Sequence, residues 1–352
     1  MSKLNFSNIA IKSICSAVPK QIIDNDTYSN YYPKNIVNEI INKTGIIQRR
    51  FAPENMCASD YSFHAAEELL TLNNIRKSEI DGIIFVSQTA DYKMPATAIL
   101  LQNKLGLLNS TFAFDINLGC SGYVYGLSVA YSFLLNPSIN NVILAVGETR
   151  SRIYHPKDRK TAFLFGDGGT ATLISKTTKK CSTHFELFSD GSKSHLIQMK
   201  AGGYRNPTNE TNLKEYIYDE FNNISSDNHG RMDGSEVFNF ALKEIPKSIQ
   251  SILKSAKIDE KQIKLAYLHQ ANKFMNDHLE KKMKMPLTKF PKSLDLFGNT
   301  SSVSIPLTIT TQTNSEEISN STILLSGFGV GMSWANCVME TDNINILPLI
   351  EI

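Results

Sequence analysis

The sequence predicts an α/β protein built from two related halves, and three observations support this prediction. Apolar runs that favour strands alternate with longer segments that favour helices, which is typical of α/β folds with a largely parallel sheet. Both halves end alike, because residues 165–174 and 321–338 each combine a glycine turn with an apolar strand. A chain of 352 residues, 41% of them hydrophobic, can fill two domains or one duplicated core. We therefore expect an N-terminal half, residues 1–178, and a C-terminal half, residues 179–352.

The N-terminal half contains five predicted strands and three predicted helices. The strands are runs rich in β-branched or alternating apolar residues, at residues 8–14, 80–88, 111–117, 141–147 and 165–174. The helices are predicted at residues 61–70, 99–107 and 123–135. Residues 25–50 are polar and charged, with a break at Thr44-Gly45, and we expect helix and turn on the surface there.

The C-terminal half begins with a change in composition. Residues 202–234 are rich in Asn, Asp, Tyr, Gly and Ser, and we expect a long excursion over the surface, a place where lids and binding loops are common. The alternation then resumes. Helices are predicted at residues 235–256, 273–284 and 302–311, and strands at residues 264–270 and on both sides of the glycine turn within 321–338.

Cys120 lies where the strand at residues 111–117 turns into the helix at residues 123–135. Gly119 and Gly122 bracket it, and glycines allow the tight backbone of a strand-to-helix turn. Unpaired N–H groups at a helix start favour negative charge, so a thiolate forms more easily there. A small buried core cysteine explains the local sequence equally well.

Two further polar positions lie beside predicted strands and turns of the C-terminal half. His269 follows a strand directly and begins His269-Gln-Ala-Asn272, at the end of the strand where α/β proteins usually place their chemistry. Asn299 lies in Gly298-Asn-Thr-Ser301, a glycine turn before a helix. Taken singly, a strand-edge histidine and a capping asparagine are the simpler interpretations.

Composition limits the functional classes. A formal charge of +2 gives no reason to expect a nucleic acid or a membrane as partner. The N-terminus lacks the pattern of a signal peptide, and no run is long enough to span a membrane. Five scattered cysteines without Cys-x-x-Cys spacing favour the reducing cytoplasm and argue against a structural metal site. We expect no metal and no cofactor.

The motifs Gly119-Cys-Ser-Gly122, His269-Gln-Ala-Asn272, Gly298-Asn-Thr-Ser301 and Gly327-Phe-Gly-Val-Gly331, in this order, resemble the β-ketoacyl-[acyl-carrier-protein] synthase III family of the thiolase superfamily. The resemblance covers nearly the whole chain, and Phe165-Gly-Asp-Gly168 also matches. It implies a five-layered αβαβα fold, usually as a homodimer. It also implies a catalytic triad of Cys120, His269 and Asn299, with backbone N–H groups of Cys120 and Val330 forming the oxyanion hole.

The implied reaction joins two thioesters. An acyl primer on coenzyme A or carrier protein loads Cys120, and malonyl-[acyl-carrier-protein] then condenses with it as carbon dioxide leaves. A neutral asparagine cannot take a proton from carbon, so Asn299 fits the decarboxylative route, in which it and His269 donate hydrogen bonds to the developing enolate. Thiolases resemble this plan but use a second cysteine near the last glycine turn, whereas Cys337 lies beyond that turn and is expected in the core.

Several positions depart from the family. The tryptophan and arginine that hold the adenine of coenzyme A are Glu39 and Phe274 here, so either acyl-CoA or an acyl-carrier protein can be the donor. Met94 replaces a phenylalanine that closes the partner's acyl pocket. Substrate contacts are implied for Met94, Arg159, Phe238, Asn272 and Phe328, and carrier docking for Lys281 and Lys282.

Two other functions remain open from sequence. The first is an acyltransferase of the same fold that moves the acyl group from Cys120 to an oxygen or nitrogen acceptor. The second is a non-catalytic scaffold subunit, against which the complete set of Cys120, His269 and Asn299 argues.

Overall fold

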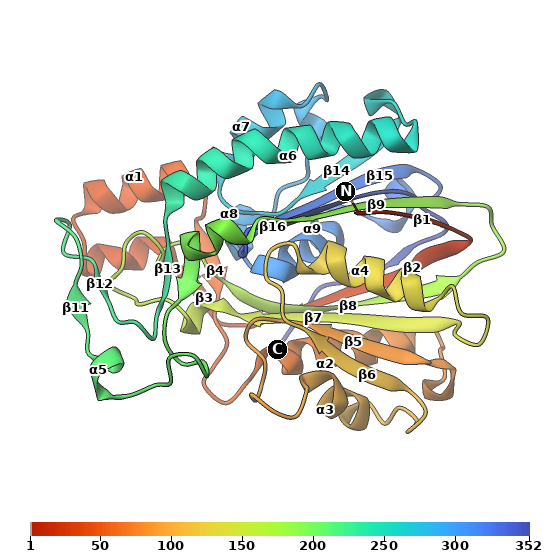
Figure 1. Ribbon diagram of the computed structural model, residues 1–352, viewed down its shortest axis with the longest axis horizontal. Coiled ribbons are helices and arrows are strands. Elements are labelled where there is room, and N and C mark those ends of the chain that lie inside the picture. The colour runs from red at the N-terminus through yellow and green to blue at the C-terminus, as the bar shows by residue number, and fades with distance from the viewer. Residues whose placement is uncertain (1) are drawn as a thin grey trace.

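The computed structural model describes residues 2–352, which form five layers in the order helix, sheet, helix, sheet, helix (Figure 1). The αβαβα arrangement implied by the family resemblance is therefore confirmed. The helices predicted from the sequence are all present, with their ends shifted by a few residues.

The first sheet has seven strands and lies lower in Figure 1. Its spatial order is β17 (Asn345–Ile346), β2 (Ile9–Val18), β8 (Asp167–Lys176), β7 (Asn141–Thr149), β5 (Gly82–Val86) and β6 (Phe112–Ile116), while β18 (Ile350–Glu351) also pairs with β2. The second sheet has the order β1 (Ser2–Ser7), β9 (Ser182–Ser189), β16 (Ser333–Glu340), β15 (Thr322–Gly329) and β14 (Ile263–Leu268).

The prediction of a largely parallel sheet holds only in part, because both sheets are mixed: in the first sheet β17 and β18 run parallel to β2, and β5 runs parallel to β6 and β7. In the first sheet β8 runs antiparallel to both β2 and β7. In the second sheet only β14 and β15 are parallel. The reason is that no helix crosses over between β7 and β8 or between β15 and β16, and a parallel pair needs such a crossover. The strands β1 and β9 were not predicted.

The chain ends join the sheets of opposite halves. Strand β1 pairs with β9 in the second sheet, whereas β17 and β18 pair with β2 in the first. The division of the chain at residue 178 stays a prediction. With that division, each half contributes at least one strand to the sheet of the other half.

Helices cover both sheets and separate them. The central layer consists of α4 (Gly122–Phe133) and α9 (Ser304–Gln312), whose apolar side chains form one core cluster with both sheets. On the second sheet's outer face lie α6 (Gly234–Ala256) and α7 (Lys273–Lys282), and on the first sheet's outer face lie α2 (Ala58–Leu72) and α3 (Thr97–Lys104) (Figure 1).

The remaining elements are short and mostly gather at one end of the sheets (Figure 1). They are β3 (Ile22–Asp24), α1 (Lys34–Thr44), β4 (Gln48–Arg50), β10 (Ile197–Met199), α5 (Glu210–Leu213), β11 (Tyr216–Ile217), β12 (Ile224–Ser225), β13 (Gly230–Met232), α8 (Leu294–Phe297) and α10 (Ser315–Ile318). No helix within residues 2–352 is both long enough and apolar enough to cross a membrane.

The expectation that residues 25–50 lie on the surface is wrong in part, because Arg49 is only 1% exposed. Its guanidinium donates to Asn25 Oδ1 at 2.8 Å and to the backbone oxygens of Ala162 and Phe165 at 2.6 and 3.2 Å. These acceptors allow the charge to be buried. Arg49 thereby ties this segment to the chain that precedes β8.

The expected surface excursion at residues 202–234 also differs from prediction. It contains four of the short elements, including β13, and its buried Asn223 holds it to the body of the protein by accepting the N–H of Arg159 at 3.0 Å. Its last part reaches the main pocket through Met232. The segment is thus part of the pocket wall.

Helix α2 packs so tightly on the first sheet that glycine is required beneath it. A Cβ atom added at Gly169 would lie 2.5 Å from the backbone nitrogen of Ser62. We expect Gly169→Ala to lower the free energy of unfolding by about 1–3 kcal/mol, because α2 must shift to make room. Urea denaturation of both proteins measures this difference.

The matched control is Gly203→Ala, because a Cβ atom at Gly203 meets nothing within 4 Å. The control should unfold at the same urea concentration as the unaltered protein. Equal stability of Gly169→Ala and Gly203→Ala would contradict the close packing of α2.

Candidate active site

Cys120 lies in the turn between β6 and α4, as the sequence predicts, and is 6% exposed. The turn is tight, with the N–H of Gly122 donating to the backbone oxygen of Gly119 at 2.6 Å. A Cβ atom at Gly122 would lie 2.6 Å from Val86 Cγ1, so glycine lets the start of α4 approach β5. The thiol therefore sits beside the N-terminus of a buried helix, where negative charge is favoured.

His269 follows β14 and is 2% exposed. Its Nδ1 lies 2.8 Å from Ser304 Oγ. That hydroxyl donates its single hydrogen to the backbone oxygen of Ser301 at 2.8 Å, so Nδ1 must be the donor to Ser304. The other ring nitrogen, Nε2, is thus the one that can exchange a proton with a reactant.

Asn299 is held by its backbone and its side chain. Its backbone N–H donates to Leu164 O at 2.8 Å, beside the bridge that pairs Phe165 with Asn299. The side-chain Oδ1 accepts the N–H of Ser301 at 2.9 Å, and Nδ2 donates to Ala271 O at 3.3 Å. This arrangement commits the oxygen and leaves one N–H of the amide for a ligand.

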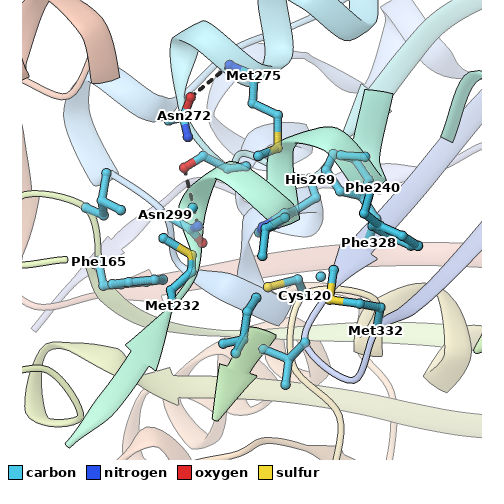
Figure 2. Close-up of a pocket in the computed structure, with 18 of the residues that line it drawn as sticks. Cys120, Phe165, Met232, Phe240, His269, Asn272, Met275, Asn299, Phe328 and Met332 are labelled. Carbon is cyan, nitrogen blue, oxygen red and sulfur yellow. Dashed lines mark hydrogen bonds between the residues drawn. The ribbon is translucent and has the colours of Figure 1, made fainter. Parts of the chain in front are cut away.

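The three side chains line one pocket, as Figure 2 shows, although they come from three distant parts of the chain. Cys120 Sγ lies 3.7 Å from Ser301 Oγ. Burial by itself raises the pKa of the thiol. The charge of His269, its hydrogen bond to the sulfur and the charge of Arg150 outweigh burial and lower the pKa of Cys120 to about 6.

The last glycine turn packs directly on Cys120. A Cβ atom at Gly329 would lie 2.7 Å from both Cβ and Sγ of Cys120, and Gly329 has φ +156°. Only glycine fits that space and that backbone conformation. Val330 follows in the turn and lines the pocket. The turn is therefore part of the site and more than a hairpin between β15 and β16.

The rest of the pocket wall is mostly apolar. Phe328 lies there and packs edge-on against His269, with ring centroids 5.5 Å apart. Sequence reasoning did not assign several wall residues to the site, and these come from several helices, strands and loops: Arg150, Tyr154, Leu164, Ile197, Met232, Val237, Phe240 and Met332. Only Arg150 could have been found from the sequence, because it lies just after the strand predicted at residues 141–147.

A larger outer cavity joins the pocket and shares Leu164, Met232 and Asn272 with it. Arg159 and Phe238, predicted as substrate contacts, line this cavity. So does a set of basic side chains: Lys43, Lys160, His195, Lys200 and Arg231.

The departures from the family motifs lie at the outer cavity or beyond it. Phe274 lines the cavity and stacks on Phe238, with ring centroids 5.0 Å apart, whereas Glu39 is exposed and is not part of the wall. Met94 is 75% exposed and lies outside both cavities. Lys281 and Lys282 end α7 on the surface.

Two other buried residues, Cys337 and Glu148, have pKa values that are raised, whereas the pKa of Cys120 is lowered. Cys337 in β16 is fully buried in the core between the sheets, as predicted, and burial raises its pKa well above the usual range. Glu148, at the end of β7, is also fully buried, and burial raises its pKa to about 7. Ser302 Oγ and Thr89 Oγ1 donate to its carboxylate at 3.0 and 3.1 Å.

Comparison with known proteins identifies the family. A family model described as 3-oxoacyl-[acyl-carrier-protein (ACP)] synthase III matches residues 114–191, and the model of its C-terminal part matches residues 253–341. The chain is 32% identical to the β-ketoacyl-[acyl-carrier-protein] synthase III of Fusobacterium nucleatum over 95% of its own length and 98% of that protein. It is 33% identical to the corresponding Streptococcus agalactiae enzyme, covering 94% and 98% of the two chains.

A solved structure agrees with the sequence comparisons. The 3-oxoacyl-(acyl-carrier protein) synthase of Burkholderia xenovorans LB400 superposes with a TM-score of 0.93 at 35% identity, over 100% of this chain and 99% of that one. The resemblance drawn from the motifs is therefore confirmed, and the chain belongs to the 3-oxoacyl-[acyl-carrier-protein] synthase III family of condensing enzymes.

Proposed function

We propose that the protein makes a 3-oxoacyl thioester by a two-step, ping-pong reaction in which Cys120 carries the acyl primer. The observation that supports this best is the pocket itself. It combines a thiol whose pKa is lowered to about 6 with two hydrogen-bond donors, His269 and Asn299. At neutral pH most of the Cys120 is thiolate, the form that attacks a thioester.

In the first step the thiolate attacks the carbonyl carbon of the acyl donor. The backbone N–H groups of Cys120 and Val330 stabilise the oxyanion, the bond from carbon to the donor sulfur breaks, and the leaving thiolate takes a proton from water. Because that proton comes from water and not from His269, the Nδ1–H of His269 stays bound to Ser304 and its Nε2–H is kept for the next step. The acyl-enzyme thus retains a donor for the second substrate.

In the second step a malonyl thioester on carrier protein places its carbonyl oxygen against His269 and Asn299. The bond to the carboxylate carbon breaks, carbon dioxide leaves, and the electron pair forms an enolate that both donors stabilise. The enolate carbon attacks the acyl carbonyl, and the Cys120 thiolate departs. The side chain of Asn299 suits this step as a donor, because its oxygen already accepts the backbone N–H of Ser301 and its amide N–H remains for the substrate.

The outer cavity suits a phosphopantetheine arm. Its basic side chains can hold phosphate, and Arg159, Phe238 and Asn272 can contact the arm. Either coenzyme A or carrier protein carries such an arm, so the donor can be either. The stacking of Phe274 on Phe238 occupies part of the aromatic surface there, which favours carrier protein. We further propose docking of an acidic carrier at Lys281 and Lys282.

The exposed Met94 fits a homodimer in which it reaches the partner's acyl pocket, as in the family. Five unpaired cysteines fit a reducing cytoplasm.

Asn299→Asp removes the amide donors and keeps an oxygen for the N–H of Ser301. We expect condensation with malonyl-carrier protein to fall about 100- to 1000-fold, because the enolate loses a preorganised donor. The measurement is the single-turnover rate of carbon dioxide release from acyl-loaded enzyme, with the 3-oxoacyl product identified by mass spectrometry.

Acyl loading of Cys120 in the same variant is measured separately by intact mass, so that a loading defect is not mistaken for a condensation defect. Undiminished condensation would contradict the decarboxylative role and favour simple acyl transfer to an oxygen or nitrogen acceptor. A failure of the unaltered enzyme to load any acyl group would favour a scaffold.

The lowered pKa of Cys120 predicts how alkylation depends on pH. Thiolate is the reactive form, so the rate with iodoacetamide should be high at neutral pH and fall as pH drops through about 6. In His269→Ala the largest stabilising charge is gone, and the midpoint should move to higher pH. Peptide mass spectrometry assigns the alkylated cysteine.

Cys57 serves as an internal control in the same experiment, because it is partly exposed and burial raises its pKa. It should react only at higher pH in both proteins. An identical profile for Cys120 with and without His269 would contradict the proposed ion pair.

A further inference from the structure

Arg150 is a buried cation in the wall of the active-site pocket. It lies in a short 3₁₀ turn (Arg150–Arg152) directly after β7, at the end of the strand, and is 4% exposed. It lines the pocket together with Cys120, and its charge helps to lower the pKa of that thiol. The guanidinium and the nucleophile therefore line the same pocket and interact through their charges.

The guanidinium has few partners for its five N–H groups. It donates to Tyr154 OH at 2.9 Å and to Gln88 Oε1 at 3.3 Å. Its Nε has no hydrogen-bond partner, and across residues 2–352 no carboxylate lies within ion-pair distance of it. The rings of Tyr154 and Phe165 cover it, at 5.6 and 5.4 Å from its central carbon. A buried charge with an unused donor is costly unless a ligand completes it.

The buried acid Glu148 interacts with Arg150 by charge but does not occupy its unused donor. Glu148 receives hydrogen bonds from Ser302 and Thr89. Within residues 2–352 it forms no ion pair with Arg150. The Cys120 thiolate supplies a negative charge in the free enzyme. That charge disappears once Cys120 carries an acyl group, and the acid that still interacts with Arg150 is Glu148, whose pKa of about 7 leaves it partly protonated at neutral pH.

We propose that Arg150 selects a short acyl primer that carries an oxygen acceptor, above all a carboxylate, close to the thioester carbon. This inference rests on the proposed loading of Cys120. The acceptor must be close because Arg150 lines the same pocket as Cys120, and the primer's carbon atoms would lie against the apolar remainder of the wall. Guanidinium matches carboxylate geometry with paired N–H donors.

The malonyl carboxylate is a poorer candidate for this contact. It must leave as neutral carbon dioxide, so a cation that binds it stabilises the ground state more than the transition state and slows the step. A carboxylate on the primer remains unchanged through both steps. Arg150 therefore suits the primer.

The test offers the full-length enzyme an equimolar mixture of N-acetylcysteamine thioesters of butyrate, 3-hydroxybutyrate and succinate. These small donors bypass the choice between coenzyme A and carrier protein. Intact-mass spectrometry reads the ratio of the three adducts on Cys120 at early times. We expect succinyl to exceed butyryl by about tenfold or more, with hydroxybutyryl between them, because one buried charged hydrogen bond is worth at least that factor.

Arg150→Leu should lose this preference or reverse it, whereas Arg205→Leu, the same change at an exposed position outside both cavities, should keep it. Arg150→Lys retains the charge but lacks the fork of donors, and should show an intermediate ratio. If Arg150→Leu does not fold, as circular dichroism would reveal, Arg150→Lys carries the test alone.

Two results would overturn the inference while leaving the proposed function intact. One is a preference of the unaltered enzyme for butyryl. The other is an equal loss of all three adducts in the Arg150 variants with an unchanged ratio, which would limit Arg150 to supporting the thiolate. No adduct from any thioester would overturn the proposed loading of Cys120 and this inference together.

Discussion

The turn around Ser301 orients all three side chains of the site. Its N–H fixes the oxygen of Asn299, and its backbone oxygen accepts the Ser304 hydroxyl that in turn fixes the tautomer of His269. Its own hydroxyl lies 3.7 Å from the sulfur of Cys120. Ser301 has φ +55°, an unusual value for a residue other than glycine. The contacts that Ser301 makes stabilise this strained backbone conformation.

The second constraint is steric and joins the two sheets at the nucleophile. The end of β15 belongs to the second sheet, and the turn that carries Cys120 leaves the first. Gly327 and Gly329 bring them into contact, because a Cβ atom on either would meet Cys120 or Ser121 at 2.7 to 2.9 Å. His269 follows β14, which pairs with β15, so the position of the histidine relative to the thiol depends on the same contact.

The sequence predicted the parts of the molecule that local chemistry determines. The strand, glycine turn and helix around Cys120 are local, and the order of four motifs identified the family and the pocket. The polar strand β9 was missed because Glu186 in it has the character of a surface residue. It is nevertheless 1% exposed, where Ser255 and Lys3, far away in sequence, bond to it. Arg49 was missed as a buried group for the same reason, since its partners Asn25, Ala162 and Phe165 lie on distant segments.

The charges of the pocket change as the reaction proceeds, and the buried residues have to tolerate each stage. In the free enzyme the thiolate of Cys120 faces two cations, His269 and Arg150. Loading of a purely hydrocarbon acyl group removes the thiolate charge that both side chains stabilise, and leaves the partly protonated Glu148 as the remaining acid that interacts with Arg150. A primer that carries its own carboxylate restores the lost charge beside Arg150. His269 then remains available to donate to the enolate oxygen, so Arg150 and His269 each have a separate partner when the carbon–carbon bond forms.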